Sequence, residues 1–511
     1  MMLFSENGTL RAMLLTLFFV AAMKGGPVRV QQHYDRVESK QLVPMLTEVL
    51  RFPTYEHNEE AITQQKQWLM KTGQSLGFAV RDAGKITEIE LPATVENAPV
   101  LGLIVHGDVQ PVEAGAWSFP PFSGKADDKY VYGRGAADDK GPLVQALLAM
   151  KALKESGVAR THTIRLLAGS REESEADEMP EYLKTHKAPD YSLVLDSEFP
   201  VVVGEKAWNA LSVTTTLAER EGASRPYAVA DLTAGLAPSI VPDHAEVTLQ
   251  WKEGAANWEP VMSAIRATVL PEGTRISMKD DASTLHVVAY GHSAHAGVNI
   301  EGGRNALMAL AYAIEPLLPT GGAKDLLAFA KRAGDDIYGT GLGFTKSDPL
   351  WGRYAVNVAT IKRDAEDAKK YTLTINIRST PPLTGTELEK VLHGYVAEFN
   401  QVTGANLAAG GWFGDSTLGF DPRAKLIGRL LQDYQQSTGV AAKPAISGGG
   451  TYAKRVPNAI AFGMWFLGKP YPGHDVDEKI EIADLQQGAR VLIYALTDIA
   501  TGPRIVEPFK P

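Results

Sequence analysis

Three short apolar runs between about residues 95 and 200 each end close to an acidic residue or a histidine. The runs cover residues 100–105, 163–168 and 192–195, and residues 141–153 carry Leu and Met at helical spacing. Strands that alternate with helices are typical of a parallel sheet. We therefore predict an α/β fold, with a mainly parallel sheet, helices on both of its faces and a ligand site where the strands end.

The pattern changes at about residue 208. Residues 212–216 and 372–377 alternate like half-exposed strands, with helical and glycine-rich stretches between them. After about residue 410 the α/β pattern returns, with a helix expected over 424–434 and a strand over 459–462. The sequence predicts an outer domain in two parts and an inserted α+β domain. Their ranges are 28–207 for the first part, 208–410 for the insert and 411–511 for the second part.

An apolar run over residues 12–23 follows Arg11. It is too short to span a bilayer and fits the apolar region of a signal peptide. We expect residues 1–27 to be such a signal, which would place the processed protein in the periplasm or outside the cell, without stable membrane insertion. The alternative is a tail on a cytoplasmic protein, because Glu6 cancels the charge of Arg11.

The chain has 51 Lys and Arg against 60 Asp and Glu, a formal net charge of −9. An acidic balance gives no electrostatic footprint for nucleic acid, so no nucleic-acid partner is expected. Cysteine is absent, which excludes disulfides, thiolate metal sites and cysteine nucleophiles. Any metal must therefore be held by His, Asp and Glu.

His106 and Asp108 follow the first apolar run. Residues two apart on an extended chain point the same way, so Asp108 can orient the ring of a metal-bound His106. An exposed loop is the alternative. Asp138 lies in a glycine-rich turn before the predicted helix, where its two oxygens can bridge two cations. The alternative there is that Asp138 or Asp139 caps the helix.

Glu172 and Glu173 follow the second run. Adjacent carboxylates raise each other's pKa unless a cation is near, so one would bind metal and the other act as a general base. A solvated acidic loop is the alternative. Asp196 follows the third run, and His474 lies in a loop far along the chain. Oxygen and imidazole donors suit Zn²⁺, Mn²⁺ or Co²⁺.

The segments that carry these residues occur in a recognisable order. They are VHGDV, GRGAADDKGP, SREESEA, LDSEFP and GHDVDEKI. In this order they resemble the two-zinc exopeptidase and deacylase family of acetylornithine deacetylase, succinyl-diaminopimelate desuccinylase, aminoacylase and carboxypeptidase G. The resemblance spans roughly residues 40–490. It implies that the outer domain is catalytic and that the insert is a lid.

The family's ligand set, carried over by position, implies two metal sites. Their ligands would be His106, Asp138 and Asp196 for one ion, and Asp138, Glu173 and His474 for the other. Glu172 would be the general base and Asp108 would orient His106, and family members often have a cis peptide at the position of Asp138–Asp139. Two such cations acidify a shared water and polarise the scissile carbonyl, and Glu172 would pass the proton to the leaving nitrogen.

The resemblance also implies groups that bind substrate. His295, in the segment GHSAHAG, would stabilise a tetrahedral oxyanion. The alternatives are a metal site formed by His292 and His295, or a buried structural His292. Arg378 would bind the substrate carboxylate, unless it faces solvent. A glycine-rich segment would offer backbone N–H groups to a carboxylate at Gly449, Gly450 and Thr451.

The long insert resembles that of the PepV-type dipeptidases, in which the extra length replaces a partner subunit and the enzyme is a monomer. Ser239 departs from that branch, which usually has Asn there, and His474 lies in GHDVDEKI rather than HxxxEYI. The resemblance implies a metal-dependent dipeptidase that hydrolyses unblocked dipeptides. The alternatives are an N-acyl-amino-acid deacylase or carboxypeptidase with the same metals, and a peptide-binding protein without catalysis, which would not need Glu172.

Overall fold

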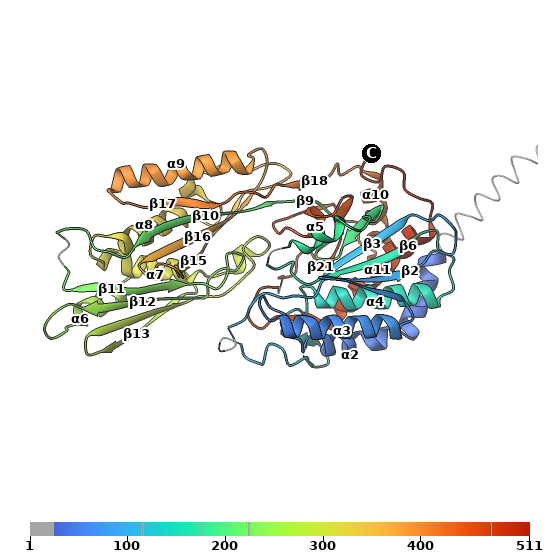
Figure 1. Ribbon diagram of the computed structural model, residues 1–511, viewed down its shortest axis with the longest axis horizontal. Helices are drawn as coiled ribbons and strands as arrows, with labels where there is room; N and C mark the ends of the chain where they lie inside the picture. The colour runs from blue at the N-terminus through green and yellow to red at the C-terminus, as the bar shows by residue number, and fades with distance from the viewer. Residues whose placement is uncertain (1–24, 114, 116, 175, 223–224, 472) are drawn as a thin grey trace, which may run out of the picture.

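The computed structural model describes residues 25–511 except 114, 116, 175, 223–224 and 472. The chain forms two lobes, each with its own large sheet and its own hydrophobic core (Figure 1). The apolar run over residues 12–23, where we expect a signal peptide, lies outside the described residues. Within the described ranges, every helix is too short or too polar to cross a membrane.

The first lobe is built on a six-stranded sheet whose centre is formed by the predicted strands. β6, β3, β7 and β20 run parallel, and β1 and β2 form an antiparallel edge. In order across the sheet the strands are β1 (Ala79–Ala83), β2 (Ile86–Leu91), β6 (Thr163–Gly169), β3 (Val100–His106), β7 (Tyr191–Val194) and β20 (Ala459–Ala461). The prediction of a mainly parallel sheet is confirmed.

Helices cover both faces of this sheet, as predicted. Successive β3 side chains point to opposite faces, so Leu103 and Val105 pack into the main core whereas Ile104 packs into a smaller cluster. The helices that contribute to the main core are α2 (Ser39–Val49), α3 (Glu59–Ser75), α4 (Lys140–Glu155), α10 (Lys425–Thr438) and α11 (Ile482–Thr501). The smaller cluster is covered by α5 (Glu178–Leu183) and the 3₁₀ turn η5 (Tyr452–Lys454).

Three small sheets complete the first lobe. Their strands, in order within each sheet, are β18 (Leu418–Gly419), β9 (Val202–Glu205) and β19 (Ala445–Ser447), then β21 (Met464–Phe466) and β8 (Ser197–Phe199), then β22 (Lys479–Glu481), β5 (Tyr130–Tyr132) and β4 (Lys125–Ala126). The last of these sheets joins the chain before α4 to the chain before α11.

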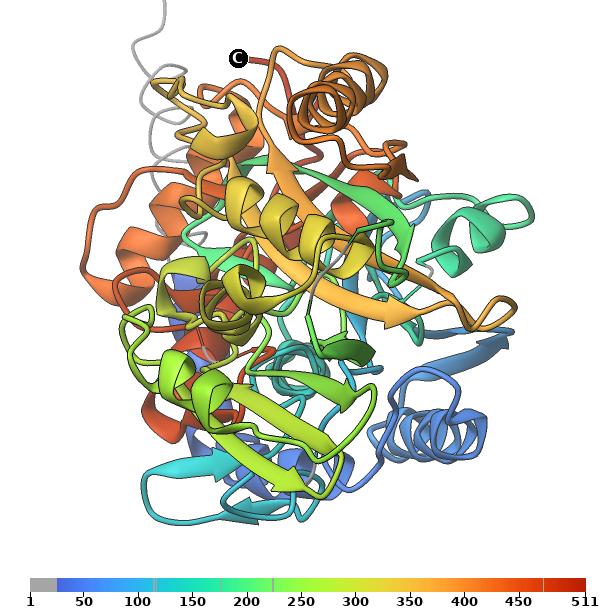
Figure 2. The same ribbon diagram turned by 90° about the vertical axis from the view of Figure 1, so that its left-hand side faces the viewer.

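The second lobe is an eight-stranded antiparallel sheet with helices against one face. In order its strands are β13 (Arg275–Asp281), β14 (Thr284–Tyr290), β12 (His244–Trp251), β11 (Tyr227–Ala234), β15 (Ala355–Arg363), β16 (Lys370–Ser379), β10 (Ala207–Thr216) and β17 (Ala408–Trp412). The helices are α6 (Glu259–Arg266), α7 (Ala306–Ile314), α8 (Gly322–Ala333) and α9 (Gly385–Thr403). They share one core with alternate side chains of the strands, and α7 and α8 lie in front of the sheet in Figure 2.

Two short stretches of chain join the lobes and lie side by side. β9 leads out into β10, and the chain returns from β17 to β18, which pairs with β9. The Lys454 ammonium lies 2.6 Å from the carbonyl oxygen of Lys206 on the outgoing stretch and 2.6 Å from the Asp415 carboxylate on the returning one. Asp415 also accepts the backbone N–H of Trp208. Because removing one partner of a buried ion pair strands the other charge, this contact fixes the junction.

A buried histidine in the first lobe gives the stability of the fold a pH dependence. His162 is fully buried, with Nε2 2.5 Å from the Tyr191 hydroxyl, and burial lowers its pKa to about 4 from 6.5. Between these values the unfolded chain binds a proton that the folded chain does not, so stability falls as pH falls. We expect His162 to account for a loss of about 3 kcal/mol in the free energy of unfolding from pH 7 to pH 4.

Urea unfolding of wild type and His162→Gln at pH 7, 5.5 and 4 measures this contribution. The variant should lose less stability on acidification than wild type. His57→Gln is the matched control, because it makes the same substitution at a histidine that is exposed rather than buried. Parallel pH dependences in wild type and His162→Gln would contradict the prediction.

Candidate metal centre

The carboxyl ends of three parallel strands open into one cavity. β3 ends at His106, and Glu172 and Asp196 come shortly after the ends of β6 and β7. The cavity has a volume of about 650 Å³, and its lining also includes residues of the second lobe such as His295 and Arg378. The acidic and imidazole side chains singled out in the sequence therefore meet at the predicted edge of the sheet.

Asp138 lies at the middle of this group, with one oxygen toward each histidine. Its Oδ1 is 3.0 Å from Nε2 of His106, and its Oδ2 is 3.2 Å from Nε2 of His474. The Tyr471 hydroxyl donates to Oδ2 over 2.6 Å. A carboxylate placed in this way is suited to bridge two cations, each of which also binds one imidazole.

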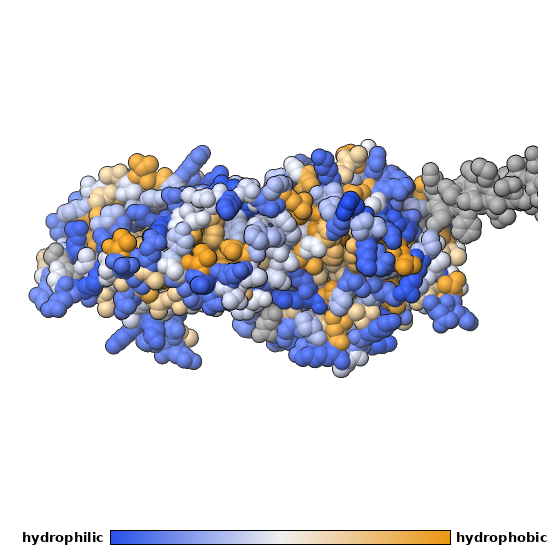
Figure 3. Space-filling model, turned by 90° about the horizontal axis from the view of Figure 1, so that it is seen from above, coloured by the Kyte–Doolittle hydropathy of each residue, from blue (hydrophilic) through white to orange (hydrophobic). Residues whose placement is uncertain are grey.

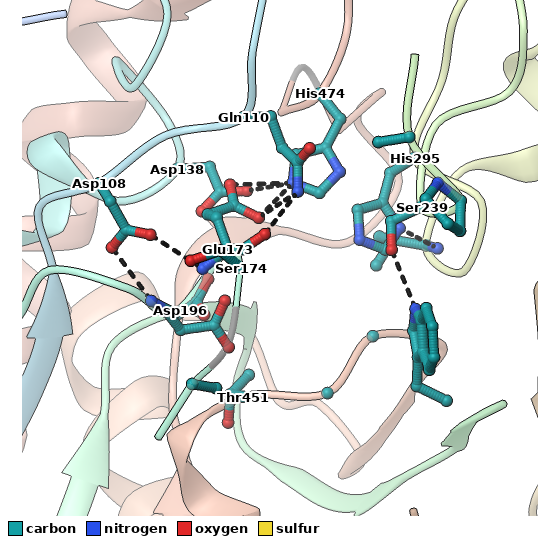
Figure 4. Close-up of a pocket in the computed structure, with 18 of the residues that line it drawn as sticks. Asp108, Gln110, Asp138, Glu173, Ser174, Asp196, Ser239, His295, Thr451 and His474 are labelled. Atoms are coloured by element: carbon teal, nitrogen blue, oxygen red, sulfur yellow. Dashed lines mark hydrogen bonds and ion pairs between the residues drawn. The ribbon is translucent and has the colours of Figure 1, made fainter. Parts of the chain in front are cut away.

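The other expected ligands complete the two sides of Asp138. Nε2 of His474 is 3.1 Å from both oxygens of Glu173 (Figure 4). Nε2 of His106 is 3.7 Å from Oδ2 of Asp196. Ligand atoms of His106, Asp138 and Glu173 lie within 4.8 Å of one another, and so do those of His106, Glu172 and Asp196. This donor set fits a pair of divalent ions. Glu172 also lies close enough to His106 and Asp196 to act as a further ligand there.

Asp108 holds both His106 and the turn that carries the two glutamates. Its backbone oxygen is 3.1 Å from Nδ1 of His106 and its Oδ1 is 3.5 Å away. The same carboxylate accepts the backbone N–H groups of Glu172 and Glu173 over 3.1 and 2.9 Å. Asp108 therefore orients the ring and places the glutamates at the same time, which extends the role that the resemblance implies for it.

The buried carboxylates strongly perturb one another. Burial raises the pKa of Glu172 well above its ordinary value, and Glu173, Asp108 and Asp138 raise it further. Burial alone would lower the pKa of His474, but Glu173 and Asp138 raise it to about 10. Protons and cations therefore compete for the same groups, and cations relieve the repulsion between the carboxylates.

Three alternative interpretations of the sequence are wrong. His106 and Asp108 are 1% and 3% exposed, so they do not form a surface loop. Asp139 stands at the start of α4 but makes no side-chain capping bond there, and instead accepts the backbone N–H of His106 over 2.9 Å. The Glu172–Glu173 pair is partly buried and faces the cavity rather than a solvated loop. The peptide bond between Asp138 and Asp139 is cis, as the resemblance implies.

Three further residues support the site and were not assigned a role in the sequence analysis. Gln110 donates to Glu173 over 2.9 Å, Tyr471 donates to Asp138, and Glu478 binds Arg134 and the N–H of Ala137. The period of two that relates His106 to Asp108 continues to Gln110, so the sequence carried a signal for it. Tyr471 shares a loop with His474, but spacing alone does not show which oxygen its hydroxyl meets.

His295 and Arg378 enter the cavity from the second lobe. Nδ1 of His295 accepts the backbone N–H groups of Gly297 and Val298 over 3.0 and 2.9 Å, and its ring centroid is 4.4 Å from that of His474. Burial lowers the pKa of His295 well below its ordinary value, so the ring is neutral and carries its proton on Nε2. Arg378 is buried, and burial lowers its pKa to about 10, which leaves it charged at neutral pH.

His292 is neither a buried structural residue nor a metal partner of His295. Its side chain is 55% exposed and its Nε2 is 3.5 Å from Oδ2 of Asp475. Neighbouring Ser293 donates to the other oxygen of Asp475 over 3.0 Å. These contacts connect the loop of His295 to the loop of His474.

The glycine-rich segment lies at the cavity, but two of its N–H groups are bound within the protein. The N–H of Gly449 donates to the Ser447 hydroxyl, and the N–H and hydroxyl of Thr451 both donate to Glu205. Burial raises the pKa of Glu205 to about 7. Of the three residues expected to bind a carboxylate, Gly450 is the one whose N–H is not engaged in this way.

Comparison with known proteins decides the family. Residues 102–498 match the sequence pattern of Peptidase family M20/M25/M40. The chain belongs to this peptidase family. The resemblance stated from the sequence motifs is thus confirmed, and with it the prediction of a hydrolase that acts on peptide bonds.

The similar proteins of this family include named dipeptidases. The chain is 28% identical over 388 residues to the Beta-Ala-Xaa dipeptidase of Lactobacillus delbrueckii subsp. lactis, with 75% of this chain and 78% of the relative covered. The dipeptidase Dug1p of Saccharomyces cerevisiae has the same fold, with a TM-score of 0.60, 14% identity and coverage of 94% and 99%. Human carnosine dipeptidase 1 has a TM-score of 0.59, 12% identity and coverage of 93% and 98%. The fold class is confirmed.

Asp138 should be required for metal binding. Because its two oxygens face two different histidines, we expect Asp138→Asn to lower the metal content from about two ions per chain to about one or fewer. Metal analysis of purified, folded protein measures this content. Asp421→Asn is the control, since Asp421 lies at the surface in an ion pair with Arg423. An unchanged metal content in Asp138→Asn would contradict the bridging role.

Proposed function

We propose that this member of the peptidase family is a dipeptidase that binds two divalent ions, Zn²⁺ in the first place, with Mn²⁺ or Co²⁺ as the alternatives. The observation that carries the proposal is Asp138, whose two oxygens face two different histidines beside Glu172. Imidazole and carboxylate donors suit all three metals. When bound, a pair of such ions lowers the pKa of water and polarises a carbonyl group.

The residues of the chain have complementary roles in this proposal. Glu172 accepts a proton from the attacking water and returns it to the leaving nitrogen, for which its raised pKa is favourable. His295 donates from Nε2 to the oxygen that becomes negative in the transition state. Arg378 attracts the carboxylate of the substrate. Asp108 keeps His106 and Glu172 in place.

The charge distribution in the cavity favours a zwitterionic dipeptide over the blocked substrates of a deacylase. Asp138 and the four carboxylates beside it on the first-lobe side carry one negative charge more than two divalent ions neutralise, which favours a free ammonium group, and Arg378 lies on the second-lobe side. An N-acyl group would bring no positive charge to the acidic side. The names of the similar proteins support the same choice.

Hydrolysis of an unblocked dipeptide and of its N-acetylated form tests this choice. We expect the N-acetylated form to be hydrolysed about 100-fold more slowly or worse, because it lacks the ammonium group. Faster turnover of the N-acetylated form would support the deacylase alternative, and cleavage of longer peptides from their C-terminus would support the carboxypeptidase. Added chelator should abolish the activity, and a divalent ion should restore it.

Glu172 should be essential for turnover but not for binding. Glu172→Gln keeps the size of the side chain and removes the base, so we expect kcat to fall by about 100-fold to 10,000-fold. Binding of the dipeptide, measured by calorimetry, should be retained. Unchanged turnover would refute the assignment and would leave a peptide-binding role without a base.

We also propose the arrangement of the chain around this site. Residues 28–207 and 411–511 form the catalytic domain, and residues 208–410 form a lid that supplies His295 and Arg378. We also propose that the chain is a monomer, because of the length of the insert. The face shown in Figure 3 agrees with this on its side of the molecule, since its hydrophobic residues form small groups among hydrophilic ones. The apolar run over residues 12–23 supports export to the periplasm or beyond.

A further inference from the structure

Ser239 lies at the wall of the cavity between two hydrogen-bond donors (Figure 4). Its Oγ is 3.1 Å from Nη2 of Arg378 and 3.0 Å from the indole Nε1 of Trp208. A guanidinium group and an indole N–H can only donate. Ser239 is therefore the acceptor in both hydrogen bonds.

These two contacts leave the Ser239 hydroxyl able only to donate its hydrogen. A hydroxyl has two lone pairs and one hydrogen. Arg378 and Trp208 occupy the lone pairs, and no acceptor among the described residues takes the hydrogen. Since both lone pairs are engaged, the O–H group can only donate to a further partner.

We propose that Ser239 is a specificity-determining residue that donates this hydrogen bond to the C-terminal carboxylate of the substrate, and that Trp208 is the residue that positions it. The inference rests on the proposed dipeptidase function. A hydrogen-bond donor beside the Arg378 guanidinium complements an anionic oxygen. It offers no acceptor to the N–H of a terminal amide. His295 already supplies a donor on the metal side, which leaves Ser239 for the carboxylate.

The same geometry explains what changes when serine stands at residue 239, where the PepV-type branch usually has asparagine. An Asn side chain would bring both a donor and an acceptor to this place. A serine whose lone pairs are both engaged brings a donor alone. The change, together with Trp208, therefore makes the wall selective for groups that accept hydrogen bonds.

Kinetics of Ser239→Ala and Trp208→Phe on a dipeptide and on its C-terminal amide test the proposal. For the free carboxylate, we expect Ser239→Ala to lower kcat/KM by about 10-fold to 100-fold, mainly through KM, because it removes a hydrogen bond to a charged group. The amide should lose much less. Trp208→Phe keeps the hydroxyl but frees a lone pair, so it should cause a smaller loss in the same direction.

Two further variants separate this role from general damage to the lid. Ser239→Thr keeps the hydroxyl and should retain most of the wild-type discrimination between the carboxylate and the amide substrate. Trp251→Phe removes an indole hydrogen bond of similar kind, to the Glu253 carbonyl oxygen, at the end of β12. This control should leave the ratio of kcat/KM for the two substrates at the wild-type value.

Calorimetry of dipeptide binding in the Glu172→Gln background tests the Ser239 contact separately from the proposed dipeptidase function. Wild type that hydrolyses no dipeptide would refute the proposed function, whereas weaker dipeptide binding after Ser239→Ala would still support the contact. The inference is overturned if Ser239→Ala affects carboxylate and amide equally. It is also overturned if kcat falls while KM and the calorimetric Kd stay the same, since Ser239 would then act in the transition state.

Discussion

The mutual repulsion of buried carboxylates around Asp138 is the constraint on which the rest of the structure depends. Asp108, Asp138, Asp196, Glu172 and Glu173 converge on a small volume that they share with His106 and His474. Such a group is costly to bury without cations. The contacts of Gln110 with Glu173 and of Tyr471 with Asp138 hold carboxylates that would otherwise turn away from one another. Glu478 holds the backbone next to Asp138 by accepting the N–H of Ala137.

The two lobes contribute different chemistry to the cavity. The parallel sheet places acidic side chains at the ends of β3, β6 and β7, because neighbouring parallel strands end at the same edge. The antiparallel sheet of the second lobe brings Arg378 at the end of β16 and His295 on the loop after β14. A substrate between the lobes therefore meets the acidic side chains of the proposed metal site on one side and the Arg378 guanidinium on the other.

Much of this arrangement could be predicted from the sequence because its signals are local. Apolar runs that end at His106 or before Asp196 fix both a strand and the position of a side chain, and the ordered motifs indicated the family. The engagement of the Thr451 N–H group could not be predicted, because it depends on Glu205, far away along the chain. The exposure of His292 likewise depends on how the lobes meet.

The two neighbouring connections between the lobes have a consequence for the evolution of such chains. β9 and β18 form one antiparallel ribbon, so the points where the second lobe departs and returns are neighbours in space. A segment attached at two adjacent points can grow or shrink without altering the order of strands in the sheet it interrupts. Lys454 binds both crossing stretches at the base of this attachment. Changes in the size of the insertion would therefore leave the metal-binding scaffold intact.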